Sequence, residues 1–194
     1  VDYDETYKKM KRYGTYNESL TVFKETTPTI SIEDTYDKFV TGGHEEKKAV
    51  TLVFTVTKDS NPQEIVRILN QEETTGTFFI DGLWLENNLA IVKEMLNHEL
   101  EILNYNDRYE EIYFSSAIQY LKNVSATTPK YCYAEYDNKE VIELCSKLEL
   151  HTIIPTIKIT SSPFQEVKEK LQNAAIISLP INQTTEIELK TVID

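Results

Sequence analysis

Short apolar segments alternate with longer amphipathic segments along most of the chain, starting at Lys48. Apolar runs rich in β-branched and aromatic residues predict buried strands at 49–56, 76–80, 100–103, 131–133, 152–154 and 174–179. Apolar residues at helical spacing predict helices at 61–70, 86–97, 115–121, 139–148, 164–171 and 186–193. This alternation indicates βα units and a mainly parallel sheet, which is either a doubly wound α/β sheet or a barrel.

Residues 1–47 lack this alternation and are rich in Tyr, Thr and charged residues. We expect a helical turn or two over 7–12, a short strand over 20–23, extended chain over 27–32 and a turn at Gly42-Gly43. The chain is therefore predicted to have an N-terminal extension, residues 1–47, and a main domain, residues 48–194. The extension either packs on the main domain or serves as a stalk.

The formal net charge is −12, from 20 Lys and Arg against 32 Asp and Glu. Such an acidic chain has no electrostatic reason to bind nucleic acid, and anionic membrane surfaces would repel it. Only five glycines occur, and no GxGxxG or GxxxxGK[ST] is present, which argues against a glycine-rich phosphate loop. No apolar run approaches the ~18 residues of a membrane span, so none is expected in the mature chain.

The two cysteines, Cys132 and Cys145, are predicted to be separate thiols, with Cys145 on the apolar face of a helix; a single disulfide is the alternative. The first residue is Val1 rather than Met, and we expect that a signal or anchor segment preceded it. The chain is therefore predicted to be extracellular or attached to the cell surface. It stops at Asp194 within a predicted helix, whereas a barrel would need one more strand.

Functional groups of parallel α/β folds lie at the carboxyl ends of the strands. The three histidines are placed elsewhere: His44 lies in the extension, and His98 and His151 lie just before predicted strands. We interpret them as packing or solvated residues. A histidine-based metal cluster or a Ser-His-Asp or Cys-His relay is therefore not expected at the carboxyl ends.

Residues 76–82 read GTFFIDG, a predicted helix follows, and residues 98–104 read HELEILN. In this order and spacing the chain resembles the polysaccharide deacetylase family (NodB-homology or carbohydrate esterase 4), whose members show ATFF, a helix and GHEIGNH. The resemblance runs from about Gly43 to Asp194. It implies a NodB-like distorted (β/α) barrel with mainly parallel strands. In active members a metal-bound water attacks an acetamide, aided by an aspartate base and a histidine acid.

The chain departs from the active-site motifs of this family. The motif TFDDGP aligns with residues 53–58, which puts Thr55 at the position of the general base and Val56 at that of a metal-binding aspartate. The metal-binding HxxxH becomes residues 105–109, with Tyr105 and Tyr109 at the histidine positions. None of these four side chains can take the family role, because neutral phenol is a poor ligand and valine and threonine supply neither carboxylate.

The remaining motifs are also altered. RPPYG becomes residues 130–134, which keep a positive charge at Lys130 and the tyrosine at Tyr133. The final catalytic histidine falls on Pro180, and the Trp/Asp-rich fourth motif cannot be placed, because the only tryptophan, Trp84, lies elsewhere. The candidate groove residues are Thr55, Val56, Asp59, Tyr105, Asp107, Tyr109, Lys130, Tyr133 and Pro180.

These substitutions predict a catalytically inactive deacetylase-like protein with no catalytic residues, no metal and no cofactor. Its expected role is binding of a neutral, chitin- or peptidoglycan-like glycan, or of a protein, at the cell envelope. Tyr105 and Tyr109 either stack on sugar rings or fill the volume of the missing imidazoles and metal.

Two alternatives stay open. The first is an active deacetylase or esterase in which Asp59, Asp107, Lys130 or Glu135 takes a new role, with Asp59 and Asp107 restoring some metal binding. The second is a structural module whose working part is the extension. Elsewhere, the charged residues of 166–170 are expected to form a solvated helix face, and Trp84 to cover the start of a helix.

Overall fold

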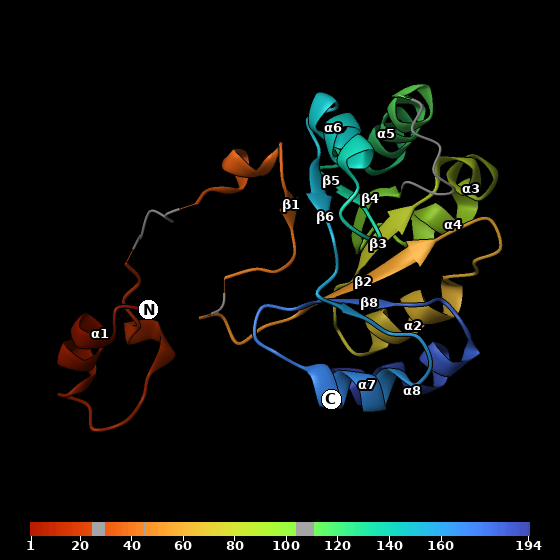
Figure 1. The fold of residues 1–194 in the computed structure, drawn as a ribbon. Helices are drawn as coiled ribbons and strands as arrows, with labels where there is room; N and C mark the ends of the chain where they lie inside the picture. Colours follow the sequence, from red (N-terminus) through yellow and green to blue (C-terminus); the bar gives the residue numbers. More distant parts are fainter. Residues whose placement is uncertain (25–29, 45, 104–110) are drawn as a thin grey trace. The chain divides into compact units, whose positions relative to one another are not determined.

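The computed structural model describes residues 1–24, 30–44, 46–103 and 111–194. The chain forms two compact units, Val1–Ser31 and Ile32–Asp194. Each unit is described by itself below, and Figure 1 shows their elements.

The first unit contains a helix, α1 (Tyr3–Met10), and a 3-10 turn, η1 (Glu18–Leu20). The Asp2 carboxylate caps α1 by accepting a hydrogen bond from Glu5 N. The backbone N–H of Val22 donates to the buried Thr6 hydroxyl at 2.9 Å, which ties the segment just after η1 to the helix. The expected helix is thus present but begins four residues earlier, at Tyr3. The predicted strand over 20–23 is wrong, and half of the segment 27–32, residues 27–29, lies outside the described residues.

The described part of the second unit holds one parallel, eight-stranded sheet with the strand order β1-β6-β5-β4-β3-β2-β8-β7, which curls into an open half-barrel (Figure 1). The α/β prediction with a parallel sheet is therefore confirmed. The strands are β1 (Phe39–Val40), β2 (Thr51–Val56), β3 (Thr77–Ile80), β4 (Glu99–Leu103), β5 (Tyr131–Tyr133), β6 (His151–Ile153), β7 (Ile157–Lys158) and β8 (Ile176–Leu179).

Helices cover the convex face of this sheet (Figure 1). They are α2 (Gln63–Gln71), α3 (Gly82–Asn87), α4 (Leu89–Glu94), α5 (Glu111–Ser125), α6 (Lys139–Lys147), α7 (Pro163–Lys170) and α8 (Gln183–Ile193), with a 3-10 turn, η2 (Ile32–Thr35), before β1. The single helix expected over 86–97 is instead two short helices. They meet at Asn88, whose backbone leaves the helical region and whose side chain donates to Trp84 O.

Two apolar clusters hold the sheet. The larger cluster lies between the sheet and the helices and includes Phe54, Phe78, Leu69, Ile102 and Leu189. The smaller cluster covers the other face of the same strands, because successive residues of a strand point to opposite sides. It comprises Val53, Phe79, Leu103, Tyr133, Ile153 and Ile176. No helix of the described chain is long and apolar enough to cross a membrane.

A disulfide joins Cys132 of β5 to Cys145 of α6, with 6.4 Å between their Cα atoms. Both residues are fully buried. The prediction of two separate thiols is therefore wrong. The apolar face of α6 does carry Cys145, as expected, but this face packs directly over β5, and that packing is a tertiary property that residue spacing does not reveal.

The boundary between the units lies after Ser31 in the structure rather than after residue 47. Residues 32–43 belong to the second unit, because β1 pairs with β6 and Tyr36 stacks on His151 at 4.0 Å. Gly42 forms an isolated bridge with Ala175, where a Cβ atom would come within 3.0 Å of Ala174 O. The pair Gly42-Gly43 was expected to mark a turn. In the structure, the absence of a side chain at Gly42 instead permits a close contact between two backbone segments.

Candidate functional site

The carboxyl ends of the strands form the edge where chemistry is expected. Thr55 lies on the concave side of β2 beside Phe79 of β3 and is half-buried. Val56, the next residue, is fully buried in the larger cluster on the helix side. Of this predicted pair, only Thr55 therefore faces the interior of the half-barrel, and Val56 is not available to a ligand.

The concave side below this edge is filled by side chains. Phe79 and Tyr133 pack with 5.4 Å between their ring centroids, and both are almost fully buried. The Tyr133 hydroxyl reaches across the half-barrel to the Ser178 hydroxyl of β8, at 3.2 Å. Tyr133, predicted as a groove residue, is thus a packing residue that links β5 to β8.

The other predicted residues in the described ranges lie at both ends of the strands. Asp59 is exposed in the loop after β2, and Pro180 is half-buried just after β8. Lys130 is exposed but precedes β5, so it lies at the amino end of the strand, away from the carboxyl edge. Tyr105, Asp107 and Tyr109 lie outside the described residues.

Glu101 is a buried carboxyl group that sequence reasoning missed. It lies on the concave side of β4 beside Phe79 and is only 4% exposed. Its Oε2 atom accepts hydrogen bonds from Lys130 N at 2.7 Å and Tyr131 N at 2.8 Å. Burial raises the pKa of Glu101 to about 7, although these two hydrogen bonds oppose the rise. The available signal was an acidic residue inside an otherwise apolar strand.

The two buried histidines are packing residues at the amino ends of strands. The Nδ1 atom of His98 accepts a hydrogen bond from Gly76 N at 3.3 Å. The His151 ring stacks on Tyr36, and its Nδ1 atom is 3.1 Å from the Thr35 hydroxyl. Burial lowers the pKa of both imidazoles. Neither ring can reach the carboxyl edge.

The metal of the deacetylase mechanism does not fit the described residues. Thr55 and Val56 replace the two carboxylates of TFDDGP, and Pro180 replaces the final histidine. The described ranges contain no group of three His, Cys, Asp or Glu side chains that could hold a metal ion. In these ranges the chain thus lacks the ligand set that metal-assisted hydrolysis requires.

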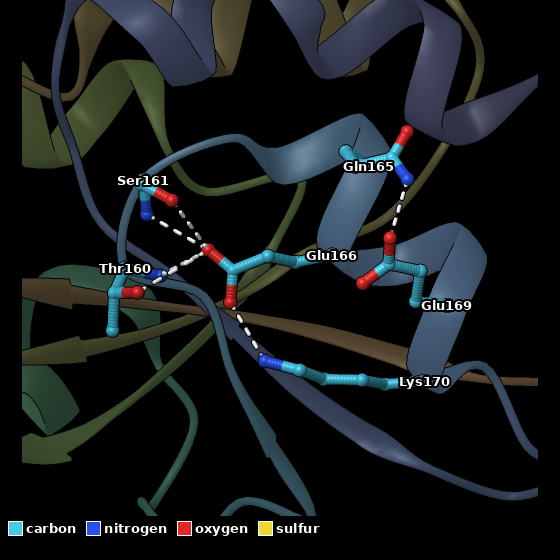
Figure 2. Close-up of polar contacts among 6 residues, drawn as sticks. All are labelled: Thr160, Ser161, Gln165, Glu166, Glu169 and Lys170. Carbon is cyan, nitrogen blue, oxygen red and sulfur yellow. Dashed lines mark hydrogen bonds and ion pairs between the residues drawn. The ribbon is translucent and has the colours of Figure 1, made fainter.

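A network of polar contacts lies at the start of α7 (Figure 2). One Glu166 oxygen accepts hydrogen bonds from the backbone N–H groups of Thr160 and Ser161, at 3.0 and 2.8 Å, and the other oxygen pairs with Lys170 at 2.7 Å. These contacts hold the pKa of Glu166 well below its usual range. The prediction of a merely solvated face is therefore wrong for Glu166, which fastens the loop after β7 to α7.

Trp84 is likewise structural. It is almost fully buried, lies within the first turn of α3, and donates from its indole nitrogen to Ser60 O at 3.0 Å. This agrees with the expected role of covering the start of a helix.

Comparison with known proteins agrees with this geometry. Residues 42–130 match the family model of polysaccharide deacetylase. The uncharacterized protein YlxY of Bacillus subtilis (strain 168) is 23% identical over 207 aligned positions. That alignment covers 96% of this chain and 65% of YlxY, so the chain spans just under two thirds of its relative.

Solved structures show the same fold. BA3943 of Bacillus anthracis, described as a CE4 family pseudoenzyme, has a TM-score of 0.82 at 22% identity, with 100% of this chain and 76% of that chain covered. The Bc1960 peptidoglycan N-acetylglucosamine deacetylase has a TM-score of 0.71 at 18% identity, over 87% of this chain and 89% of that chain. The resemblance inferred from the motifs is therefore confirmed: residues 42–130 match the polysaccharide deacetylase family model, and the chain has the fold of the family 4 carbohydrate esterases.

Proposed function

We propose that this protein is a deacetylase-like protein without metal-assisted hydrolysis, which binds a neutral glycan at the cell envelope. The observation that carries the proposal is the replacement of both TFDDGP carboxylates, by Thr55 and by a Val56 that is buried on the helix side. Hydrolysis of an unactivated acetamide needs a base and an activated water, and neither residue supplies them.

The similarity to BA3943 supports this interpretation, since that protein is described as a pseudoenzyme of the same fold. A neutral ligand is favoured because the net charge of −12 repels anionic polymers. An N-acetylglucosamine polymer is the natural first candidate, because the deacetylase Bc1960, with the same fold, is described as acting on peptidoglycan N-acetylglucosamine.

The location is proposed on a separate ground. The second unit contains a disulfide between Cys132 and Cys145. Disulfides persist in oxidising compartments outside the cytosol, whereas cytosolic thiols are kept reduced. A position outside the cytoplasmic membrane would bring the protein into contact with wall glycans.

The test combines an activity assay with a binding assay on the same protein. The purified chain is incubated with N-acetylglucosamine tetramer and with peptidoglycan, with zinc or cobalt added, and released acetate is measured. Binding of the tetramer is measured by isothermal titration calorimetry. We expect binding in the micromolar to millimolar range and no acetate above a no-protein control.

Two results would contradict the proposal. The first is acetate release that an Asp59→Asn or Asp107→Asn variant abolishes, which would establish the alternative of a rearranged active site. The second is the absence of any binding heat at millimolar tetramer with folded protein, which would favour a protein partner instead.

A further inference from the structure

The exposed face of α5 differs from the exposed faces of the other long helices of the second unit. Elsewhere these faces carry exposed charges, such as Arg67 on α2, Glu143 on α6, Lys168 on α7 and Lys190 on α8. From residue 112 to residue 121, α5 has no charged residue, although the chain is 27% charged. We define the α5 face by Ile112, Ser115, Ser116, Gln119, Tyr120 and Asn123.

The α5 face is rich in uncharged hydrogen-bonding groups. Gln119 donates from Nε2 to the Oδ1 atom of Asn123 at 3.0 Å, across one helical turn. This bond orients both amides and leaves the Gln119 carbonyl and both side-chain N–H groups of Asn123 for another partner. Tyr120 lies between these residues on the same face and is 37% exposed.

The six residues of the α5 face line a shallow hollow of about 380 Å³. A second hollow, of about 370 Å³, shares Ile112 and Ser116 with it and extends to Asp81 and Gly82, just past the carboxyl end of β3. Through Ile112 and Ser116 the α5 face thus continues to the carboxyl edge of the sheet.

The chemistry of this surface favours one class of ligand. Hydroxyl and amide groups around a tyrosine ring suit sugars, whose ring faces are apolar and whose rims carry hydroxyl and acetamide groups. The centres of protein-binding surfaces also lack charge and often carry tyrosine, but they are depleted in serine, and the α5 face has two serines, Ser115 and Ser116. An ionic ligand would need a countercharge, which the α5 face does not offer.

We propose that the α5 face binds a neutral oligosaccharide, with Tyr120 stacking on a sugar ring and the amides of Gln119 and Asn123 binding its hydroxyl or acetamide groups. This inference rests on the proposed glycan-binding function and assigns it to a site outside the altered motifs.

The test is calorimetric titration of the full chain with N-acetylglucosamine tetramer, using Tyr120→Ala, Gln119→Ala and a matched control, Tyr136→Ala. Tyr136 is also exposed, but it lies after β5 at the carboxyl edge. Loss of a stacking ring is expected to weaken binding about tenfold for Tyr120→Ala. Gln119→Ala should weaken it about threefold, and Tyr136→Ala should leave it unchanged. Circular dichroism checks the fold, and the exposed Gln119 keeps the test valid if Tyr120→Ala is unstable.

The failures of the two proposals are distinguishable. Tetramer binding that Tyr120→Ala and Gln119→Ala leave unchanged but Tyr136→Ala weakens would overturn the α5 site and preserve glycan binding at the carboxyl edge. No binding by the unaltered chain would overturn both.

Discussion

Glu101 makes stability depend on pH in a way that a single substitution should remove. Its carboxyl group is buried among apolar side chains, and its pKa rises from 4.5 to about 7 on folding. The folded state therefore holds a proton that the unfolded chain releases between these two values. Stability from this group is fully present below about pH 4.5 and is lost as the pH rises through about 7. At ~1.4 kcal/mol per pKa unit, the loss amounts to roughly 3 kcal/mol.

The perturbation is Glu101→Gln, which keeps an oxygen to accept from Lys130 N and Tyr131 N but cannot ionise. Urea unfolding followed by circular dichroism at pH 5, 6, 7 and 8 measures the free energy of unfolding of both proteins. We expect the variant and the parent to be similar at pH 5. At pH 8 the variant should be more stable by roughly 2–3 kcal/mol.

The difference between the two proteins cancels the contributions of His98 and His151, because both proteins contain these two residues. Glu86→Gln serves as the control, because Glu86 is an exposed glutamate on α3 and is not one of the charges that act on Glu101. It should leave the pH profile unchanged. Parallel profiles for Glu101→Gln and the parent would refute the reasoning.

Three further predictions follow from named contacts. Reduction of the Cys132–Cys145 disulfide should lower the free energy of unfolding by roughly 3 kcal/mol, because the bridge closes a loop in the unfolded chain. The urea midpoint should therefore be lower with reductant, and an unchanged midpoint would mean that the bridge is absent in solution. Glu166→Gln should lower the free energy of unfolding by ~1 kcal/mol at pH 7, whereas the control Glu169→Gln should lower it little. Because the pKa of Glu166 is depressed in the folded state, the effect of Glu166→Gln should shrink as the pH falls below the ordinary glutamate pKa. Tyr133→Phe and Ser178→Ala should each cost ~1 kcal/mol in thermal or urea unfolding, and the double variant should cost less than their sum, because both remove the same hydrogen bond; strict additivity would contradict that contact.

The sequence predicts the central strands well, because β2, β3, β4 and β8 are buried on both faces and read as apolar runs. It misses β1 and β7, which have only two residues each and are strands only through their neighbours. The sequence does not show which side of β2 faces the helices. The register of β2 with β3 is needed to place Thr55 on the inner face and Val56 on the helix side.

Carboxyl groups that accept hydrogen bonds from the backbone were the hardest features to predict. Glu166 appears in the sequence as an ordinary surface acid, and Glu101 as a single acid within the apolar run 100–103. Each is instead fixed by backbone N–H groups, from residues 130–131 in one case and 160–161 in the other. Such partners depend on how loops meet the sheet, which residue spacing does not encode. The disulfide was missed for the same reason.

The strand order also has a consequence for dissecting the protein. The matched segment 42–130 supplies β2, β3 and β4, but β2 has its second neighbour in β8, near the end of the chain, and β4 has its second neighbour in β5. A fragment limited to the matched residues would therefore be a three-stranded sheet with two long unpaired edges and would be prone to aggregate. During synthesis, β2 likewise waits for residues 176–179 before its backbone is fully paired. The smallest piece expected to fold by itself is consequently the whole second unit, 32–194.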